Sequence, residues 1–262
     1  MPIIECLSRH SATEFCNVSE MYASARAGAQ SVVTCEMVPA IAEAAREIIA
    51  LNGFAERVRV VAKKSYDLDP DVDMSGLADV FVSEIVDNML LREDVLPVTE
   101  HAVKVPLKPG AKIIPARGLV RVALAYDAKF DDARMGTING FDLSPFNRLA
   151  PNFHRARDGG RHLTLLSMAT TLFEFDFQSG GPFPATTVAK TLMSTGGEAN
   201  GIAQWIALQM DEEGWYENDP KPGASSAWAV MFWPFTAPRD CPAGTTIEVG
   251  GSHDRRTLQI WA

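Results

Sequence analysis

The first half of the chain alternates short apolar runs with a well-marked helix, and this pattern limits the possible folds more than any other feature. Apolar runs at residues 31–35, 58–61 and 78–82 are typical of buried strands. A helix is predicted over residues 40–51, because Pro39 suits the first helical turn and Asn52-Gly53 ends the pattern. This strand–helix–strand order predicts a parallel sheet in an α/β domain.

Acidic residues follow two of these predicted strands. Glu36 follows the run at 31–35, Glu84 follows the run at 78–82, and Glu93 stands nine positions after Glu84, near the next helical stretch. Ligands of open α/β sheets bind outside the carboxyl ends of the strands, where an acid such as Glu36 can accept hydrogen bonds from ribose hydroxyls. A solvated strand end is the alternative for Glu36.

Glu84 and Glu93 form a pair that suits a planar cation. Two partly desolvated carboxylates could hold one guanidinium from two sides, because its fork of N–H donors matches paired carboxylates. The alternative is a solvated helix start stabilised by the helix dipole, which fits Glu93 better than Glu84.

These residues and their neighbours resemble the protein arginine methyltransferases, a family of S-adenosylmethionine-dependent enzymes. Ser83-Glu84 with Glu93 carries the resemblance, together with residues 27–37, Asn52-Gly-Phe54, residues 60–65 and residues 107–115. It implies a Rossmann-like domain that binds S-adenosylmethionine through Glu36, Met37, Lys64 and Ser65. It also implies that Glu84 and Glu93 orient a substrate guanidinium for direct methyl transfer.

One motif of that family is missing. Its first strand runs into a glycine-rich turn, whose glycines let the backbone approach the methionine part of the cofactor. That turn should fall near residues 12–18, where the chain has Thr13-Glu-Phe-Cys-Asn-Val18. The Rossmann-like domain is therefore expected to be incomplete at its N-terminus. Either the protein is a degenerate or truncated relative that binds the cofactor poorly, or its first twenty or so residues are not the natural start of an active enzyme.

The second half of the chain has a different pattern. From Val120, short alternating runs bounded by Gly, Pro, Asp or Ser predict strands at residues 120–125, 172–177, 186–192, 201–209, 227–235, 246–249 and 257–261. Regular short strands predict an antiparallel β-barrel or sandwich. The expected organisation is a cofactor-binding domain at residues 1–116 and a barrel-like substrate domain at residues 117–262.

The resemblance adds two expectations for this half. Gly140-Phe-Asp-Leu-Ser144 is similar to the start of a family arm that mediates dimerisation, which would lie near residues 128–160. A simple surface loop is the alternative. In Ser225-Ser-Ala-Trp228, the tryptophan is similar to one that helps wall the substrate-arginine site, whereas Ala227 stands where the family has histidine. A core aromatic role is the alternative for Trp228.

Composition narrows the list of partners. A net charge of -9 over 262 residues argues against a general nucleic-acid binder and is compatible with a basic peptide partner. The four cysteines form no CxxC pair and the five histidines lack ligand spacing, so neither a metal site nor a disulfide framework is expected. Without an apolar run of about 20 residues or a secretory signal, a cytoplasmic protein without a membrane partner is expected.

The sequence therefore predicts methyl transfer from S-adenosylmethionine to a guanidinium nitrogen of a protein or peptide arginine, with a homodimer through the arm. Two other hypotheses stay open: a non-catalytic binding or scaffold protein, and a methyltransferase acting on a different substrate. Glu36, Glu84 and Glu93 favour the enzyme, and the missing glycine turn favours the binding protein.

Overall fold

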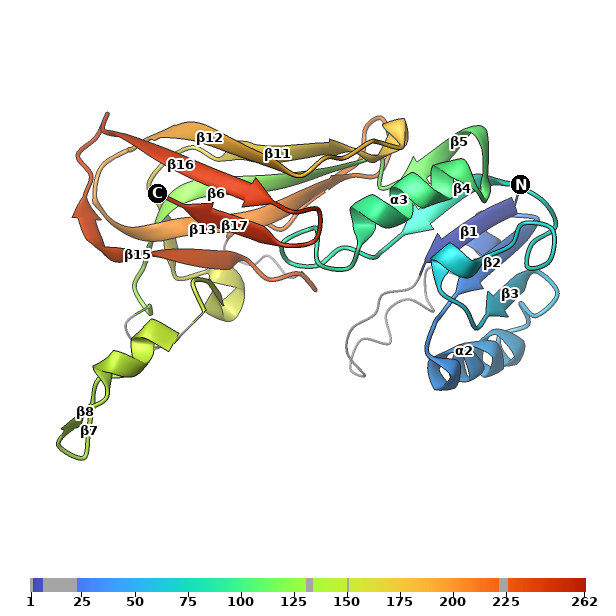
Figure 1. Ribbon diagram of the computed structural model, residues 1–262, viewed down its shortest axis with the longest axis horizontal. Coiled ribbons are helices and arrows are strands. Elements are labelled where there is room, and N and C mark those ends of the chain that lie inside the picture. Colours follow the sequence, from blue (N-terminus) through green and yellow to red (C-terminus); the bar gives the residue numbers. More distant parts are fainter. Residues whose placement is uncertain (1, 7–22, 131–133, 150, 222–225) are drawn as a thin grey trace.

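The chain forms an α/β half and an all-β half, which lie side by side along the long axis of the molecule (Figure 1). The computed structural model describes residues 2–6, 23–130, 134–149, 151–221 and 226–262, with the backbone alone at residues 2–6, 157 and 158. Within these ranges, no helix combines the length and the hydropathy needed to cross a membrane.

A parallel sheet organises the α/β half. Its strand order is β3-β2-β1-β4-β5, with β1 at Pro2–Cys6, β2 at Ser31–Cys35, β3 at Val58–Val61, β4 at Ala78–Ser83 and β5 at Leu107–Ile114. Neighbouring strand residues such as Val32 and Val33 belong to different hydrophobic clusters, because successive side chains point to opposite faces. The sheet therefore buries both of its faces.

Two helices cover these faces. Helix α2 (Pro39–Leu51) packs Ala42, Ala45 and Ile49 with the cluster on one face, and α3 (Val95–Lys104) belongs to the cluster on the other. The end of α2 follows from the sequence: Asn52 Nδ2 donates to the Ile48 carbonyl at 2.8 Å, and the chain then leaves the helix through Gly53 at φ 77°. The predicted helix and the predicted strands β2, β3 and β4 are confirmed.

The central strand of this half differs from expectation. Residues 2–6 form the central strand β1, which the sequence did not predict. This five-residue strand is held by parallel pairing to β2 on one side and to β4 on the other. Pairing between segments distant in the sequence leaves no local pattern that could predict the strand. Pro109-Gly110 lies inside β5, where the pairing to β4 shifts register and Gly110 adopts φ 76°. Residues 12–18, where the sequence lacks the glycine-rich turn of the family, lie outside the described residues.

The all-β half consists of two curled antiparallel sheets. The first has the order β10-β6-β13-β15-β9, with β11 also paired to β6 and β14 to β13; the second has the order β12-β16-β17. Their bounds are β6 Arg117–Asp127, β9 His154–Arg155, β10 Leu163–Leu165, β11 Thr170–Asp176, β12 Thr186–Met193, β13 Glu198–Gln209, β14 Trp215–Glu217, β15 Met231–Asp240, β16 Thr246–His253 and β17 Leu258–Trp261. An antiparallel barrel-like domain was predicted, and it is observed.

One predicted strand begins in the wrong place. The alternating run at residues 227–235 predicted a strand from Ala227, but β15 begins at Met231. The preceding residues form a loop because Trp228 and Ala229 donate hydrogen bonds to the α/β half instead of to a neighbouring strand. Alternation alone cannot detect such distant bonds.

The two halves share one hydrophobic core. A single cluster contains Phe81 and Leu96 from the α/β half as well as Phe177 and Ile260 from the all-β half. The chain passes from the parallel sheet to the first antiparallel sheet over a short connection, since β5 ends at Ile114 and β6 begins at Arg117.

Polar contacts reinforce this junction on the side of α3. The β16–β17 turn contributes Arg255, whose Nη2 lies 2.7 Å from Glu100 Oε2, and Arg256, whose Nε lies 2.6 Å from Asp94 Oδ1. Gln178, in the short helix η6 (Phe177–Ser179), exchanges hydrogen bonds with the backbone of β5. Hydrogen bonds and ion pairs therefore join the halves along several elements.

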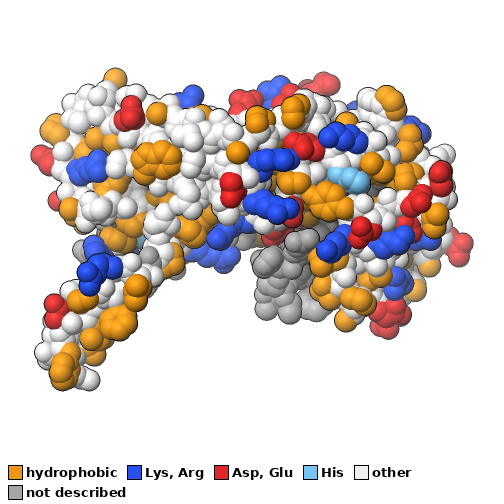
Figure 2. Space-filling model, in the orientation of Figure 1, with side chains coloured by type: hydrophobic (Ala, Val, Ile, Leu, Met, Phe, Trp, Pro, Cys, Tyr) orange, Lys and Arg blue, Asp and Glu red, His pale blue; other side chains and the backbone are white. Residues whose placement is uncertain are grey.

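An arm projects from the all-β half (Figure 1). It contains the hairpin β7 (Thr137–Ile138) and β8 (Phe141–Asp142), followed by η4 (Ser144–Leu149). Asn139 and Gly140 both have positive φ, as a tight two-residue hairpin turn requires. Figure 2 shows hydrophobic side chains along this arm, and the exposed ones are Met135, Ile138, Phe141, Phe146 and Leu149.

A buried carboxylate anchors the base of the arm. Asp127 Oδ2 lies 3.3 Å from His154 Nε2, and Asp127 Oδ1 lies 3.0 Å from His162 Nε2. Burial alone raises the pKa of Asp127, but the hydrogen bonds from His154 and from the Lys129 amide, together with the two imidazoles, hold it below its usual value. The two ends of the arm are thus tied to one acidic group.

Candidate functional site

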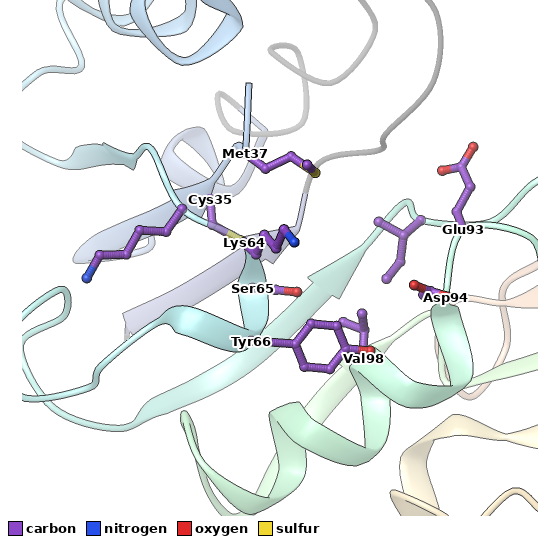
Figure 3. Close-up of a pocket in the computed structure, with 10 residues that line it drawn as sticks. Cys35, Met37, Lys64, Ser65, Tyr66, Glu93, Asp94 and Val98 are labelled. Atoms are coloured by element: carbon purple, nitrogen blue, oxygen red, sulfur yellow. The ribbon is translucent and has the colours of Figure 1, made fainter. Parts of the chain in front are cut away.

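A pocket opens at the carboxyl edge of the parallel sheet, where the chain leaves β2, β3 and β4 (Figure 3). It is lined by Cys35, Met37, Lys63, Lys64, Ser65, Tyr66, Ile85, Glu93, Asp94 and Val98. This is the edge at which open α/β sheets bind ligands. The lining combines apolar surface with carboxylates, amines and hydroxyls.

Four of the residues singled out in the sequence line this pocket: Met37, Lys64, Ser65 and Glu93. In Figure 3, Met37, Lys64 and Ser65 lie on one side, and Glu93 lies across from them beside Asp94. Loops after two different strands and the start of α3 therefore meet in one place. The other three predicted residues, Glu36, Glu84 and Trp228, lie close to the lining in sequence or contact but outside it.

Glu36 lies directly after β2, between the lining residues Cys35 and Met37. Its side chain is buried, and Oε1 accepts a hydrogen bond of 2.6 Å from the Val38 amide. Burial raises the pKa of Glu36, while that hydrogen bond acts in the opposite direction. Burying a carboxylate at this position lowers the stability of the fold. Functional residues often have such a destabilising environment and a shifted pKa.

Glu84 and Glu93 stand at the two ends of a connecting segment. Glu84 follows the last residue of β4, and Glu93 precedes Asp94, the N-cap of α3. Both side chains are half-buried, and the Oε2 atom of each is screened from solvent. Ile85, next to Glu84, lines the same pocket as Glu93. We call residues 84–93 the acid segment.

The acid segment is shaped by its own hydrogen bonds. Asp87 Oδ1 accepts the amides of Met89 at 3.1 Å and Arg92 at 3.2 Å. Burial raises the pKa of Asp87, and these amide bonds oppose that rise. Leu90 adopts φ 76°, which is unusual for a branched side chain, and it is fully buried. The segment is thus compact and packed into the core.

Trp228 reaches the acid segment from the all-β half. Its Nε1 donates a hydrogen bond of 2.8 Å to the carbonyl of Val86, and its ring meets the ring of Tyr216 edge-on at 5.3 Å. Ala227, where the resembling family has histidine, is exposed. Trp228 therefore packs beside the segment that carries both acids, and its role toward a substrate stays a prediction.

Sequence reasoning missed several lining residues. Tyr66 follows Ser65 in the same loop, and its ring packs against His101 of α3 at 5.2 Å. Val98 faces the pocket one helical turn into α3. An aromatic residue after a strand and an apolar residue in a helix carry no signal that separates a pocket wall from an ordinary core contact.

Among the residues that the structure describes, no group of three or more His, Cys, Asp or Glu side chains is arranged to hold a metal ion. The described cysteines Cys35 and Cys241 are buried thiols. The Cys35 thiol lines the pocket together with carboxylates, lysines, hydroxyls and apolar side chains.

No family model matches the chain. Comparison with individual proteins, however, finds relatives that are named arginine methyltransferases. The chain is 35% identical over 241 residues to an arginine N(omega)-methyltransferase of Streptomyces achromogenes subsp. streptozoticus, covering 91% of this chain and 66% of that protein. It is 28% identical over 204 residues to protein arginine N-methyltransferase 7 of Drosophila grimshawi, covering 72% of this chain and 29% of that protein. The chain thus spans just under two thirds of the first relative and under one third of the second.

Comparison with solved structures also finds arginine methyltransferases. A solved complex of Trypanosoma brucei, described as the PRMT1 enzyme–prozyme heterotetramer with AdoHcy, superimposes with a TM-score of 0.79 at 18% identity, covering 98% of this chain and 82% of that chain. A Rossmann-like domain followed by an antiparallel β-barrel is therefore the architecture of this protein. By sequence, the chain belongs to the protein arginine methyltransferase family, and it shares the fold of the solved complex.

Proposed function

We propose that this protein transfers a methyl group from S-adenosylmethionine to a guanidinium nitrogen of arginine. The observation that carries the proposal is the pocket at the carboxyl edge of the sheet, which Met37, Lys64 and Ser65 line together with Glu93. The names of the relatives, which are arginine methyltransferases, support the same reaction.

The pocket fits the proposed cofactor in its chemistry. In this proposal Glu36, which is buried at the end of β2 between two lining residues, accepts hydrogen bonds from the ribose hydroxyls. Tyr66 and Val98 offer apolar surface to an adenine ring, and Lys64 and Ser65 belong to the same wall. The cofactor, when bound, supplies an electrophilic methyl group.

Glu84 and Glu93 would bind the guanidinium of the substrate arginine. Glu84 and Glu93 accept N–H bonds from the guanidinium, fix its plane, and concentrate lone-pair density on the nitrogen that becomes methylated. Partial burial strengthens these bonds, because the screening by water is reduced. The nitrogen loses one proton in the reaction, and one of the two carboxylates is its acceptor. Positioning supplies most of the rate enhancement.

The direct test combines binding and activity. Titration calorimetry with S-adenosylhomocysteine should show micromolar binding, and Glu84→Gln and Glu93→Gln should each abolish methylation while the fold stays intact. Glu43→Gln, on the exposed surface of α2, is the matched control and should remain active. Full activity in both site variants would overturn the assignment of the acids. Absence of cofactor binding up to millimolar concentration would favour a non-catalytic binding protein.

The acceptor has two candidate forms. The sequence predicts arginine in a protein or peptide, whereas the Streptomyces relative is named an arginine methyltransferase without the word protein. Parallel assays with free L-arginine and with an arginine-rich peptide separate these possibilities. Methylation of free arginine alone would assign the protein to small-molecule metabolism, and methylation of the peptide alone would support the protein substrate.

We also propose a homodimer through the arm and a cytoplasmic location. The exposed Phe141 and Leu149 support an interface on the arm, because large apolar side chains gathered on a surface are typical of contact sites. The buried thiols of Cys35 and Cys241 suit a reducing compartment. Sedimentation velocity of the purified chain and fractionation of its host cells test the two statements.

A further inference from the structure

The acid segment is held from outside by the all-β half. Trp228 Nε1 donates to the Val86 carbonyl at 2.8 Å, the Ala229 amide donates to Asn88 Oδ1 at 2.6 Å, and Gln204 Nε2 donates to the Asn88 carbonyl at 3.0 Å. The partners are separated by 116 to 142 positions in the sequence. These bonds therefore fix the segment relative to the barrel and not merely relative to itself.

Asn88 is the centre of this contact. It lies near the middle of the acid segment, between Glu84 and Glu93, and both of its oxygens accept hydrogen bonds from the all-β half. The hydrogen bonds of Asp87 shape the segment locally but do not attach it to the barrel. A change at Asn88 would therefore act on both ends of the segment, where the two acids stand.

Gln204 is an unusual choice for its location. It lies in the middle of β13 and is fully buried, and its Oε1 has no hydrogen-bond partner among the described residues. A buried amide with one unsatisfied group destabilises a fold, whereas an apolar side chain of similar size avoids that cost. Stability therefore does not explain this glutamine. Its hydrogen bond to Asn88 is the contact that an apolar side chain cannot make.

We propose that Asn88 and Gln204 are positioning residues, which hold the acid segment against the barrel and thereby set the separation of Glu84 and Glu93. This inference rests on the proposed function, because the separation matters only if the two acids grip one guanidinium. Neither residue belongs to the lining of the pocket. Their effect on the reaction is indirect, through the backbone that carries both acids.

The test compares Asn88→Ala with a matched control. Gln178→Ala removes two hydrogen bonds between the same halves of the molecule, to Ala111 and Ile113 of β5, which are not part of the acid segment. We expect Asn88→Ala to lower kcat at least tenfold, to leave the Kd for S-adenosylhomocysteine within twofold, and to speed amide hydrogen exchange in residues 84–93. Gln178→Ala should change neither kcat nor that exchange.

Two further variants give signatures that a purely structural role would not produce. Asn88→Asp keeps an oxygen for the Ala229 amide and should restore slow exchange in residues 84–93. Gln204→Leu should keep or raise Tm while lowering kcat, since it removes the unsatisfied buried group together with the bond to Asn88.

Specific outcomes would overturn the proposal. Unchanged kcat and unchanged exchange in Asn88→Ala would do so, as would an equal loss of kcat in Gln178→Ala, which would indicate general coupling of the halves. If the unaltered chain methylates no arginine acceptor, the proposed function fails; hydrogen exchange still decides whether Asn88 and Gln204 hold the acid segment.

Discussion

Gly118 lies at a tightly packed point of the junction between the two halves, and Gly118→Ala tests how closely that junction is packed. A Cβ atom at this position would stand 2.8 Å from two ring carbons of Phe177 and 3.0 Å from Leu90 Cδ1. Phe177 cannot move aside easily, because it is buried and stacks on Phe175 while meeting Phe183 edge-on. Leu90 is equally confined, since it is fully buried in the acid segment.

The size of the effect follows from this geometry. Carbon atoms in contact prefer a separation of about 3.5–4.0 Å, so the added methyl group overlaps Phe177 by roughly 0.7 Å or more. Overpacking of a core costs about 1–3 kcal/mol of unfolding free energy, and the lower backbone entropy of the unfolded alanine chain returns about 0.4–1 kcal/mol. A net loss of about 1–2 kcal/mol corresponds to a Tm decrease of roughly 3–6 °C in a chain of this size.

Differential scanning calorimetry measures this decrease, and the chain offers a matched control. Gly136→Ala makes the same chemical change where nothing lies within 4 Å and the backbone is not left-handed, so its Tm should stay the same or rise slightly. In a double-mutant cycle, Gly118→Ala should lower Tm less in the presence of Phe177→Leu than in its absence, because the smaller side chain makes room for the added methyl group. A Tm for Gly118→Ala equal to that of Gly136→Ala would refute the packing argument.

Three further predictions use charge and exposure. The pKa of Asp127 lies below its usual value of 3.8, so the ionised carboxylate stabilises the fold above about pH 4, and this stabilisation is lost as the pH falls further. In urea titrations at descending pH, the unfolding free energy of Asp127→Asn should therefore fall less than that of the unaltered chain. Glu36→Gln should raise Tm at neutral pH, because it removes a buried charge, and should weaken cofactor binding in calorimetry. Phe141→Ser should weaken self-association in sedimentation velocity, whereas Trp215→Ser, at an exposed site outside the arm, should not.

Each of these has a contrary outcome. Equal acid sensitivity in Asp127→Asn and the unaltered chain would show that the ties at the base of the arm do not stabilise the fold. A lower Tm together with unchanged binding in Glu36→Gln would contradict both parts of that prediction. A monomeric unaltered chain, or equal dimerisation after both exposed-residue changes, would exclude the arm as the interface.

The sequence predicted those helices and strands whose ends are determined by residues next to them in the chain. The helix α2 begins at Pro39 and ends at Asn52-Gly53, and β2 and β4 are apolar runs followed by acids. The central strand β1 was missed, because five residues without flanking turn signals take their place only through pairing on both sides. The start of β15 was misplaced for a related reason: the residues before Met231 bond to the acid segment instead of to a strand.

The same distinction applies to the site. The resemblance to a known family singled out Met37, Lys64 and Ser65, and these residues line one pocket with Glu93 because all four lie where strands end or a helix begins. Asn88 and Gln204 could not be singled out, since an amide in a loop and an amide in a strand gain meaning only through a hydrogen bond spanning 116 positions. Residues that support a site are harder to predict than residues that line it.

The shared core has a consequence for the synthesis of the protein. Leu90 and Leu91 of the acid segment belong to the same hydrophobic cluster as Leu258 and Ile260 of β17. A nascent chain that has released only its Rossmann-like half lacks the all-β part of this cluster and the hydrogen bonds of Gln204, Trp228 and Ala229 to the acid segment. We expect the site to mature only after β17 has left the ribosome, so that translation order delays activity and makes chaperone protection of the earlier half important.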